Sequence, residues 1–400
     1  MAAMDSSLSL ADSQTATQWI FTGTSDDPDA RSAGAIAAAQ ALAGDDAKLL
    51  VVFAAASYNQ SALLAGVASV VPDVPVIGCS TAGEIVASGP GSGGVVVMAL
   101  GGSGFSVATA AASGEPNGLR QASATVAESF SRLDPRPYKV LLLLSDGLGG
   151  DQQEVVRGAF GVLGAEVPLI GGCAGDDMRM QHTWQFHGTE VLEHAIVGAA
   201  IGSEGPIGIG VQHGWRAVGE PMVVTSSSGN SVLTLDDQPA LDAYLQRLDA
   251  PAEVGDDAAA LTLFAATHPL GLSRRGGDEV RFVAGGDLSA GSLNCIAAVP
   301  QGSMVRIMQG DYDSVLGATN VACEQAVSAL DGRTPLGLLA FDCIARKGVL
   351  GDAGVAAEVG RITDYAPGAP VAGFYTYGEI ARTHGVSGFH NQTLVVVAFS

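Results

Sequence analysis

The chain is poor in basic residues, and lysine is the scarcest of them. It has 19 lysines and arginines, of which three are lysines, against 41 acidic residues, which gives a formal net charge of −22. Proteins that bind nucleic acid carry a basic surface that neutralises phosphates. The charge balance therefore argues against a nucleic-acid partner, and equally against an anionic membrane surface.

Long hydrophobic runs and paired cysteines are also missing. No apolar run approaches the roughly 20 residues that cross a bilayer, and the start MAAMDSSLSLADSQ lacks the parts of a secretory signal. We therefore expect no membrane insertion and a cytoplasmic location. Five cysteines without a close pair fit neither a disulfide framework nor a cysteine-based zinc site.

What the chain does have is one short pattern written three times. The copies read PVIGCSTAGEI at 75–85, PLIGGCAGDD at 168–177 and PVAGFYTYGEI at 370–380. Each copy is an apolar strand followed by a turn of small or polar residues, and an apolar run lies on either side of it. Such repetition predicts a fold with internal pseudo-symmetry.

The order of predicted elements indicates an α/β protein with mixed sheets in layers flanked by helices. The repeating unit is β-α-β-turn-β, and strands alternating with helices favour this class. We expect a disordered segment at 1–16 and two domains at 17–235 and 236–400. The second domain carries short strands that we expect to be antiparallel, among them LTLFAA at 261–266, after a loop at 249–260.

The turns are the first place to look for a site. GCSTAGEI offers a thiol, hydroxyls, backbone N–H groups and the carboxylate of Glu84, which together could hold a small polar ligand bearing an amine. The alternative is a tight structural turn. The candidate ligand-binding residues are Cys79, Ser80, Thr81, Gly83, Glu84, Cys173, Asp176, Arg346, Tyr377, Gly378, Glu379, His390 and Asn391.

Two stretches could carry chemistry of another kind. Cys79 is a candidate nucleophile, but no histidine near it in sequence would activate the thiol, so a buried structural cysteine is expected. The stretch 377–393 holds Glu379, His384 and His390, which could perform acid–base work or bind haem iron. Alternatively, His390 and Asn391 satisfy the backbone at the entry to the last strand.

Taken in order, these motifs resemble the FIST family. The resemblance rests on GCSTAGEI, on GWRAVGEPMVVTSSSGNSVLTLDDQPALDAYL, on FDCIAR and on GFYTYGEIA…FHNQT, and it covers roughly residues 17–399. It implies a non-catalytic sensory module with N-terminal and C-terminal FIST domains. Small ligands such as amino acids are proposed for the family, and some stand-alone bacterial members are haem-containing nitric-oxide sensors that act on a histidine kinase.

Four functions follow for comparison with the structure. The first is a small-ligand sensor that signals through a separate partner such as a histidine kinase, because the chain has no output segment of its own. The second is a haem sensor with His213, His268 or His390 as the axial ligand. The others are an interaction scaffold and a cysteine-dependent enzyme. The sequence favours a sensor that is not an enzyme.

Overall fold

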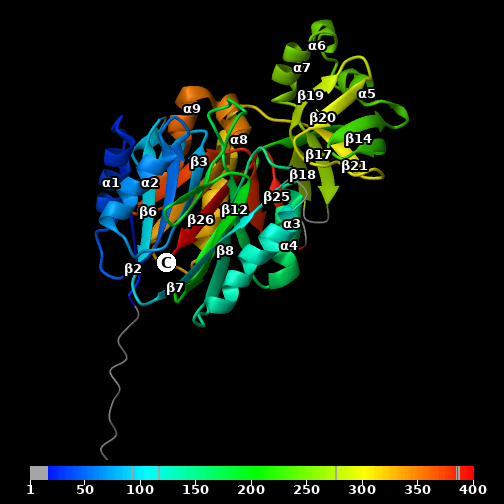
Figure 1. Ribbon diagram of the computed structural model, residues 1–400. Coiled ribbons are helices and arrows are strands. Elements are labelled where there is room, and N and C mark those ends of the chain that lie inside the picture. The colour runs from blue at the N-terminus through cyan, green and yellow to red at the C-terminus, as the bar shows by residue number, and fades with distance from the viewer. Residues whose placement is uncertain (1–16, 92, 116–117, 275–276, 384, 386–387) are drawn as a thin grey trace, which may run out of the picture.

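The structure, a computed structural model, describes residues 17–91, 93–115, 118–274, 277–383, 385 and 388–400. The expected disordered segment at 1–16 and His384 lie outside these residues. The described chain forms three similar units and one lobe inserted into the third unit (Figure 1).

The first two units follow one another along the chain. The first consists of β1 (Trp19–Ser25), α1 (Ala30–Ala41), β2 (Ala47–Ala55), α2 (Gln60–Val70), β3 (Val76–Thr81), β4 (Glu84–Val86), β5 (Gly89–Gly91) and β6 (Val95–Gly101). The second consists of β7 (Phe105–Ser113), α3 (Leu119–Ala127), the 3-10 helix η1 (Glu128–Arg132), β8 (Tyr138–Ser145), α4 (Gln153–Leu163), β9 (Leu169–Cys173), β10 (Gln185–His187), β11 (Glu190–Leu192) and β12 (Ala195–Ser203).

The third unit repeats this order after an interruption. It consists of β13 (Ile207–Gln212), then α8 (Tyr312–Ser328), β22 (Gly337–Cys343), α9 (Ile344–Asp364), β23 (Val371–Thr376), β24 (Glu379–Arg382), β25 (Phe389–His390) and β26 (Leu394–Phe399). Helix starts are fixed locally: Asp29 caps α1, Asn59 caps α2, and Asp311 forms a capping box in α8.

Each unit builds one six-stranded sheet but borrows its last two strands. The sheet orders are β1-β6-β2-β3-β10-β11, β7-β12-β8-β9-β24-β25 and β13-β26-β22-β23-β4-β5. The hairpin of the second unit thus completes the first sheet, that of the third unit completes the second sheet, and that of the first unit completes the third sheet. This cyclic exchange of hairpins closes the three units into a ring.

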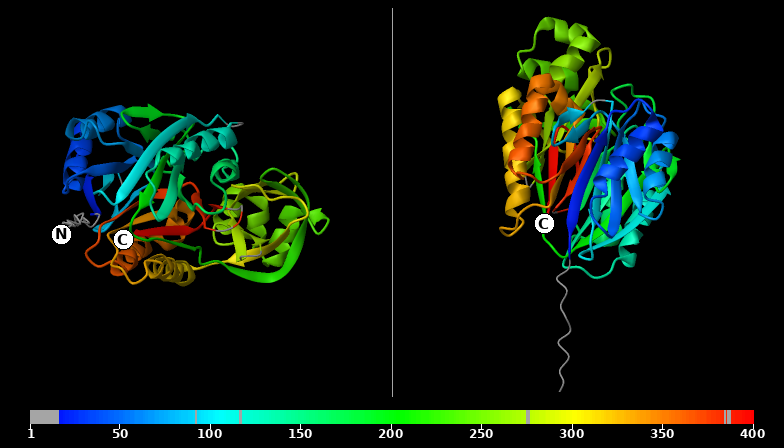
Figure 2. Two further views of the ribbon diagram at one scale, coloured as in Figure 1. Left: turned by 90° about the horizontal axis from the view of Figure 1, so that it is seen from below. Right: turned by 90° about the vertical axis from the view of Figure 1, so that its left-hand side faces the viewer.

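One core lies between the three sheets. It draws apolar side chains from all three units, including the aromatic contact of Phe53 with Phe374 at 4.7 Å between ring centroids. The helices cover the outer faces of the sheets (Figure 2). Because both faces are buried, β2, β8 and β22 read as nearly continuous apolar runs. The α/β class, the mixed sheets and the pseudo-repeats are confirmed.

The lobe spans residues 216–309 and has its own apolar core beside the three units. Its antiparallel strands are β14 (Arg216–Ser228), β15 (Ser231–Leu235), β16 (Gln238–Pro239), β17 (Leu270–Arg274), β18 (Gly277–Arg281), β19 (Val283–Asp287), β20 (Ser292–Cys295) and β21 (Met304–Gln309). Its helices are α5 (Ala240–Arg247), α6 (Ala252–Asp256) and α7 (Ala258–Ala265). Residue 235, the expected domain boundary, ends β15, and the division there stays a prediction.

Two local expectations in the lobe are wrong. LTLFAA is helical, because the Asp257 side chain accepts from the N–H groups of Ala259 and Ala260 and so starts α7. The expected loop at 249–260 contains α6. The apolar run alone favours a strand, but the N-cap at Asp257, just before it, starts a helix.

Candidate functional site

The three repeated turns meet at one place, at the ends of β3, β9 and β23. There each turn donates a backbone N–H to the carbonyl oxygen of another turn. The bonds run from Ala82 to Tyr375 (3.0 Å), from Tyr377 to Cys173 (3.1 Å) and from Gly175 to Ser80 (3.1 Å). These residues hold corresponding positions in the three units, so the bonds form a closed cycle, which we call the turn ring.

Glu84 and Glu379 hold the same position in the ring and make the same contacts. Each carboxyl is bonded to a threonine hydroxyl three residues earlier, Thr81 at 2.6 Å or Thr376 at 2.5 Å. Each also accepts a backbone N–H just before the last strand of its unit, from Gly94 or Thr393. A hydroxyl can donate or accept, so both the ionised and the neutral carboxyl can be satisfied.

Burial raises the pKa of both carboxyls. The Glu84 side chain is nearly buried and its pKa rises to about 7, although bonds from Thr81 and Gly94 oppose the shift. Glu379 is fully buried and its pKa rises to about 8 for the same reason. These two groups therefore change charge near neutral pH, where ordinary glutamates stay ionised.

The third member of this set is Gln185, which the sequence analysis missed. Glu84 pairs with Phe374 across the borrowed hairpin, Glu379 pairs with Gly172, and Gln185 pairs with Cys79 at the matching place. The Gln185 amide accepts from the N–H of Ala195 and donates to the Thr183 hydroxyl. An insertion at 176–183 separates Gln185 from the repeated turn, so the sequence does not show that Gln185 corresponds to Glu84 and Glu379. The threonine two residues before Gln185 is the one sequence signal of this correspondence.

Asp176, expected among the binding residues, anchors that insertion instead. Its carboxylate accepts from the Tyr377 hydroxyl and from the backbone N–H groups of Met180, Gln181 and His182. Burial opposes ionisation, but the bond from Tyr377 and the three backbone bonds lower the pKa of Asp176. Tyr377 and Asp176 are thus brought together, between the third and second units.

A cavity of about 350 Å³ opens beside Glu84. Its polar wall includes Thr24, Ser25, Asp26 and Glu84. The residue across the hairpin differs between the three units: Gly91 faces Glu84, His390 faces Glu379 and Leu192 faces Gln185. Glycine leaves free the space that a side chain takes up in the other two units.

In the third unit the corresponding region is further closed by the entry to the lobe. The Trp215 indole, which is 3% exposed, donates to the carbonyl of Gln392 at 3.1 Å. Asn391 and Gln392 are buried there, and the Gln392 amide donates to the carbonyl of Ala266 in the lobe. His390 bonds the carbonyl of Ala381, the Asn391 amide donates to the carbonyl of His390, and a ligand-binding role for these two residues stays a prediction.

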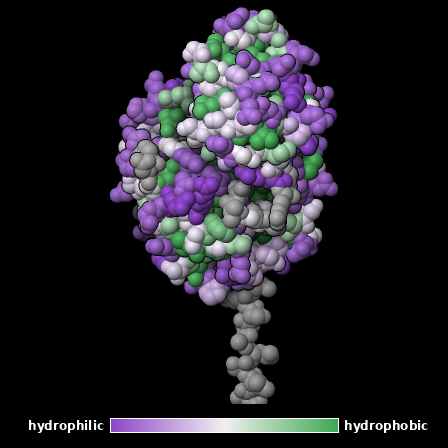
Figure 3. Space-filling model, turned by 90° about the vertical axis from the view of Figure 1, so that its right-hand side faces the viewer, coloured by the Kyte–Doolittle hydropathy of each residue, from purple (hydrophilic) through white to green (hydrophobic). Residues whose placement is uncertain are grey.

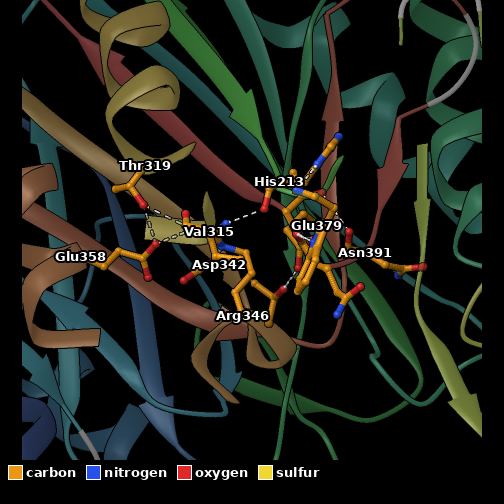
Figure 4. A network of polar contacts seen from close by, with 12 residues as sticks. His213, Val315, Thr319, Asp342, Arg346, Glu358, Glu379 and Asn391 are labelled. Atoms are coloured by element: carbon orange, nitrogen blue, oxygen red, sulfur yellow. Dashed lines mark hydrogen bonds and ion pairs between the residues drawn. The ribbon is translucent and has the colours of Figure 1, made fainter. Parts of the chain in front are cut away.

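Arg346 is fully buried in a separate polar network beside the turn ring (Figure 4). Its guanidinium bonds the carboxylates of Asp342 (2.7 Å) and Glu358 and the carbonyl of His213 (2.9 Å). Burial lowers the pKa of Arg346, but Asp342 and Glu358 outweigh it and raise the pKa overall. Burial and, after it, Glu358 raise the pKa of Asp342 above its ordinary value, and Arg346 opposes this shift.

The cysteines lie in the interior of the protein and not at its surface. All five are buried as free thiols. Burial raises the pKa of Cys79, and it raises that of Cys173 to about 12 although a bond to Ser145 opposes the shift. A thiolate is the reacting form of cysteine, so these side chains are placed as small core residues.

Each of the three expected haem ligands bonds the protein through one ring nitrogen, and their assignment to haem stays a prediction. His213 Nδ1 accepts from the Trp215 N–H, and burial lowers the pKa of His213 to about 4. His268 stacks on Phe264 and bonds its carbonyl, while His390 bonds the carbonyl of Ala381. None of the three histidines borders the cavity beside Glu84. Within the described ranges, no cluster of His, Cys, Asp and Glu could hold a metal ion.

Comparison with protein families assigns most of the chain. Residues 48–238 match the FIST N domain and residues 240–382 match the FIST C domain. The chain belongs to the FIST family. FIST domains are generally taken as sensory signal-transduction domains and not as enzymes, so the sensory expectation holds at this level. Both matches include strands of the turn ring, so the site lies where the two FIST domains meet.

Relatives of this FIST protein match it over different shares of its length. An uncharacterized protein of Mycobacterium tuberculosis is 26% identical over 95% of this chain and 99% of its own length. An uncharacterized protein of Mycobacterium bovis is 25% identical over 58% of this chain and 60% of its own length. One from Methanocaldococcus jannaschii is 27% identical over 31% of this chain and 24% of its own length. None of the described helices is long and apolar enough to cross a membrane.

Proposed function

We propose that this FIST protein is a cytoplasmic sensor that binds a small polar ligand beside Glu84 and signals through a separate partner protein such as a histidine kinase. The cavity of about 350 Å³ is the observation that carries the proposal. Its volume falls within the range of small-molecule sites, roughly 300–1,000 Å³. Glu84 of the first repeated turn lines it, and the sequence had already singled out this residue.

The lining indicates the ligand class. Asp26 and Glu84 are acids, whereas Thr24, Ser25 and Ser88 offer hydroxyls and backbone groups. An ammonium group would pair with the acids, and a polar tail would find hydrogen bonds, as in an amino acid or a small amine. Because Glu84 belongs to the turn ring, a ligand that changes its charge or contacts acts on all three units through the ring bonds.

A thermal-shift screen of amino acids and small amines tests the proposal. A ligand at about 100 times its dissociation constant stabilises the folded state by about 2.7 kcal/mol, a rise that the melting temperature reports. Binding should strengthen as pH rises through about 7, since Glu84 must be ionised to pair with an ammonium group. Glu84→Gln should weaken binding at least tenfold.

Glu379→Gln is the matched control, because Glu379 has the same contacts but does not line the cavity beside Glu84. It should leave the affinity unchanged. The proposal fails if no amine raises the melting temperature, or if the two substitutions weaken binding equally. A loss at Glu379 alone would place the ligand elsewhere and contradict it as well.

A further inference from the structure

A second, smaller cavity of about 100 Å³ lies where the lobe meets the second unit. Arg157 and Asp151 come from α4 and the loop before it, and Arg274 and Arg281 come from β17 and β18 of the lobe. Figure 3 shows this side of the molecule, which is hollowed at the junction of lobe and core. The cavity has the liquid volume of about three waters, enough for a carboxylate or phosphate group.

The wall of this cavity is basic in a strongly acidic protein. Three guanidinium groups and one carboxylate line it, whereas the whole chain has a formal net charge of −22. Arginine presents several N–H donors in a planar fork that matches the oxygens of a carboxylate or a phosphate. The composition of the wall is therefore that of an anion site.

The lobe arginines are held in place by hydrogen bonds that use some of the N–H donors of each guanidinium group. Arg281 is 4% exposed and donates to the carbonyls of Ala298 (3.1 Å) and Val280 (3.1 Å) and to Glu279 (3.0 Å). Arg274 donates to Glu279 through Nε, at 3.1 Å. Such bonds orient the guanidinium groups before a ligand arrives, which lowers the entropy cost of binding.

Arg157 reaches the same cavity from the core side. It donates to Glu154 through one terminal nitrogen, Nη1, and its side chain is 49% exposed. Its positive charge thus faces those of Arg274 and Arg281 across the junction. Glu154 and Glu279 pair with these arginines and offset part of their positive charge, and an anion in the cavity would bridge the guanidinium groups of the lobe and of the core.

We propose that a small oxyanion, as a carboxylate or a phosphate group, binds between Arg157 and the lobe arginines and holds the lobe against the second unit. This site is separate from the cavity beside Glu84 and does not depend on the function proposed for that cavity. It couples an anion to the position of the lobe, because only the docked arrangement places both sets of arginines around one ligand.

Anion titration of the full chain tests the site. Inorganic phosphate and malonate are compared with chloride at constant ionic strength, with the melting temperature as the readout. We expect phosphate, malonate or both to raise it, and the one that acts identifies the oxyanion class. If chloride acts equally well, the site holds an adventitious ion only. If neither oxyanion raises the melting temperature, the site binds no anion. Either result overturns the proposal.

Substitution separates the site from general charge effects. Arg157→Gln should weaken the apparent affinity at least tenfold, and Arg157→Lys should weaken it less, because the charge remains but the fork is lost. Arg120→Gln is the matched control, since Arg120 bonds the same Glu154 but does not line the cavity. Equal losses in the Arg120 and Arg157 variants would refute the site.

Hydrogen exchange reports the docking of the lobe. The oxyanion should slow exchange in the connections at 212–216 and 309–312, and this effect should persist in the Glu84→Gln variant. That variant keeps the anion site but weakens binding in the proposed ligand cavity, so the two proposals can fail independently. Unchanged exchange in both connections would contradict the docking role.

Discussion

Glu84 and Glu379 hold one position in two units, and Gln185 holds it in the third. Glutamine also bonds a threonine hydroxyl and accepts a backbone N–H, but it donates to the hydroxyl and carries no charge. The backbone setting therefore requires a hydrogen-bonding side chain of this length but not a carboxylate. The acids are retained where the fold could have used an amide, and one of the two borders a cavity.

The double variant Glu84→Gln/Glu379→Gln should flatten the pH dependence of stability. Both folded-state pKa values, about 7 and about 8, lie above the ordinary 4.5. The folded state therefore binds more protons than the unfolded state, and stability present below about pH 4.5 is lost as pH rises to about 8. At about 1.4 kcal/mol per pKa unit, the loss amounts to several kcal/mol.

Urea unfolding at pH 5 and pH 8.5 measures this effect. The natural chain should lose stability between the two values, and the double variant should lose clearly less. A Thr→Ala change at Thr81 alone serves as the control, because it removes a bond to Glu84 but leaves both carboxyls. Parallel pH profiles for the natural and double-variant chains would contradict the assignment of raised pKa values.

Several elements could be predicted from sequence because their signals are local. The apolar runs gave β2, β8 and β22. The repeated pattern gave the three turns, but not the backbone bonds that join them in the turn ring. Gln185, the cavity and the lobe entry at Trp215 could not be predicted, because they depend on an insertion, on a glycine opposite an acid, and on contacts between distant segments.

The way the strands pack explains the glycine in each repeated strand. Gly78, Gly171 and Gly373 lie where the strand passes closest to its parallel neighbour, and a Cβ there would overlap a carbonyl oxygen of that neighbour. The shared PVIG, PLIG and PVAG pattern thus reflects close approach of two backbones and not a ligand.

Gly373→Ala should destabilise the protein by about 3 kcal/mol, near the upper end of overpacking costs, because the carbonyl of Ala340 cannot move without breaking the sheet. Gly161→Ala is the control within a helix, where no atom lies within 4 Å of the added Cβ. There alanine should stabilise by about 0.5–1 kcal/mol through helix propensity. Thermal or urea unfolding gives both values, and equal effects would refute the close-approach argument.

At the scale of the whole molecule, the exchange of hairpins makes the three units depend on one another. A fragment of residues 1–203 keeps the first two units but lacks β23, the partner of β4, and β24, the partner of β9. It also loses the third wall of the central core. We expect this fragment to show no cooperative thermal transition by near-ultraviolet circular dichroism.

Replacing residues 216–309 with a short turn is the matched control. It also removes a large part of the chain, but the lobe has a core of its own, and the first unit joins β1 to α1 directly. The shortened chain should still melt cooperatively. A cooperative transition in the fragment 1–203 at the temperature of the full chain would show that the units fold independently.

The same exchange sets an order in time during synthesis. The hairpin at residues 84–91 is made about 280 residues before its partner strand at residues 371–376. At roughly 5–20 residues per second, the early hairpin waits on the order of tens of seconds without its sheet. During that interval the unpaired edge of the hairpin is accessible to chaperones and to other nascent chains. Pairing of this hairpin with β23 closes the ring and ends the period in which the edge could cause aggregation.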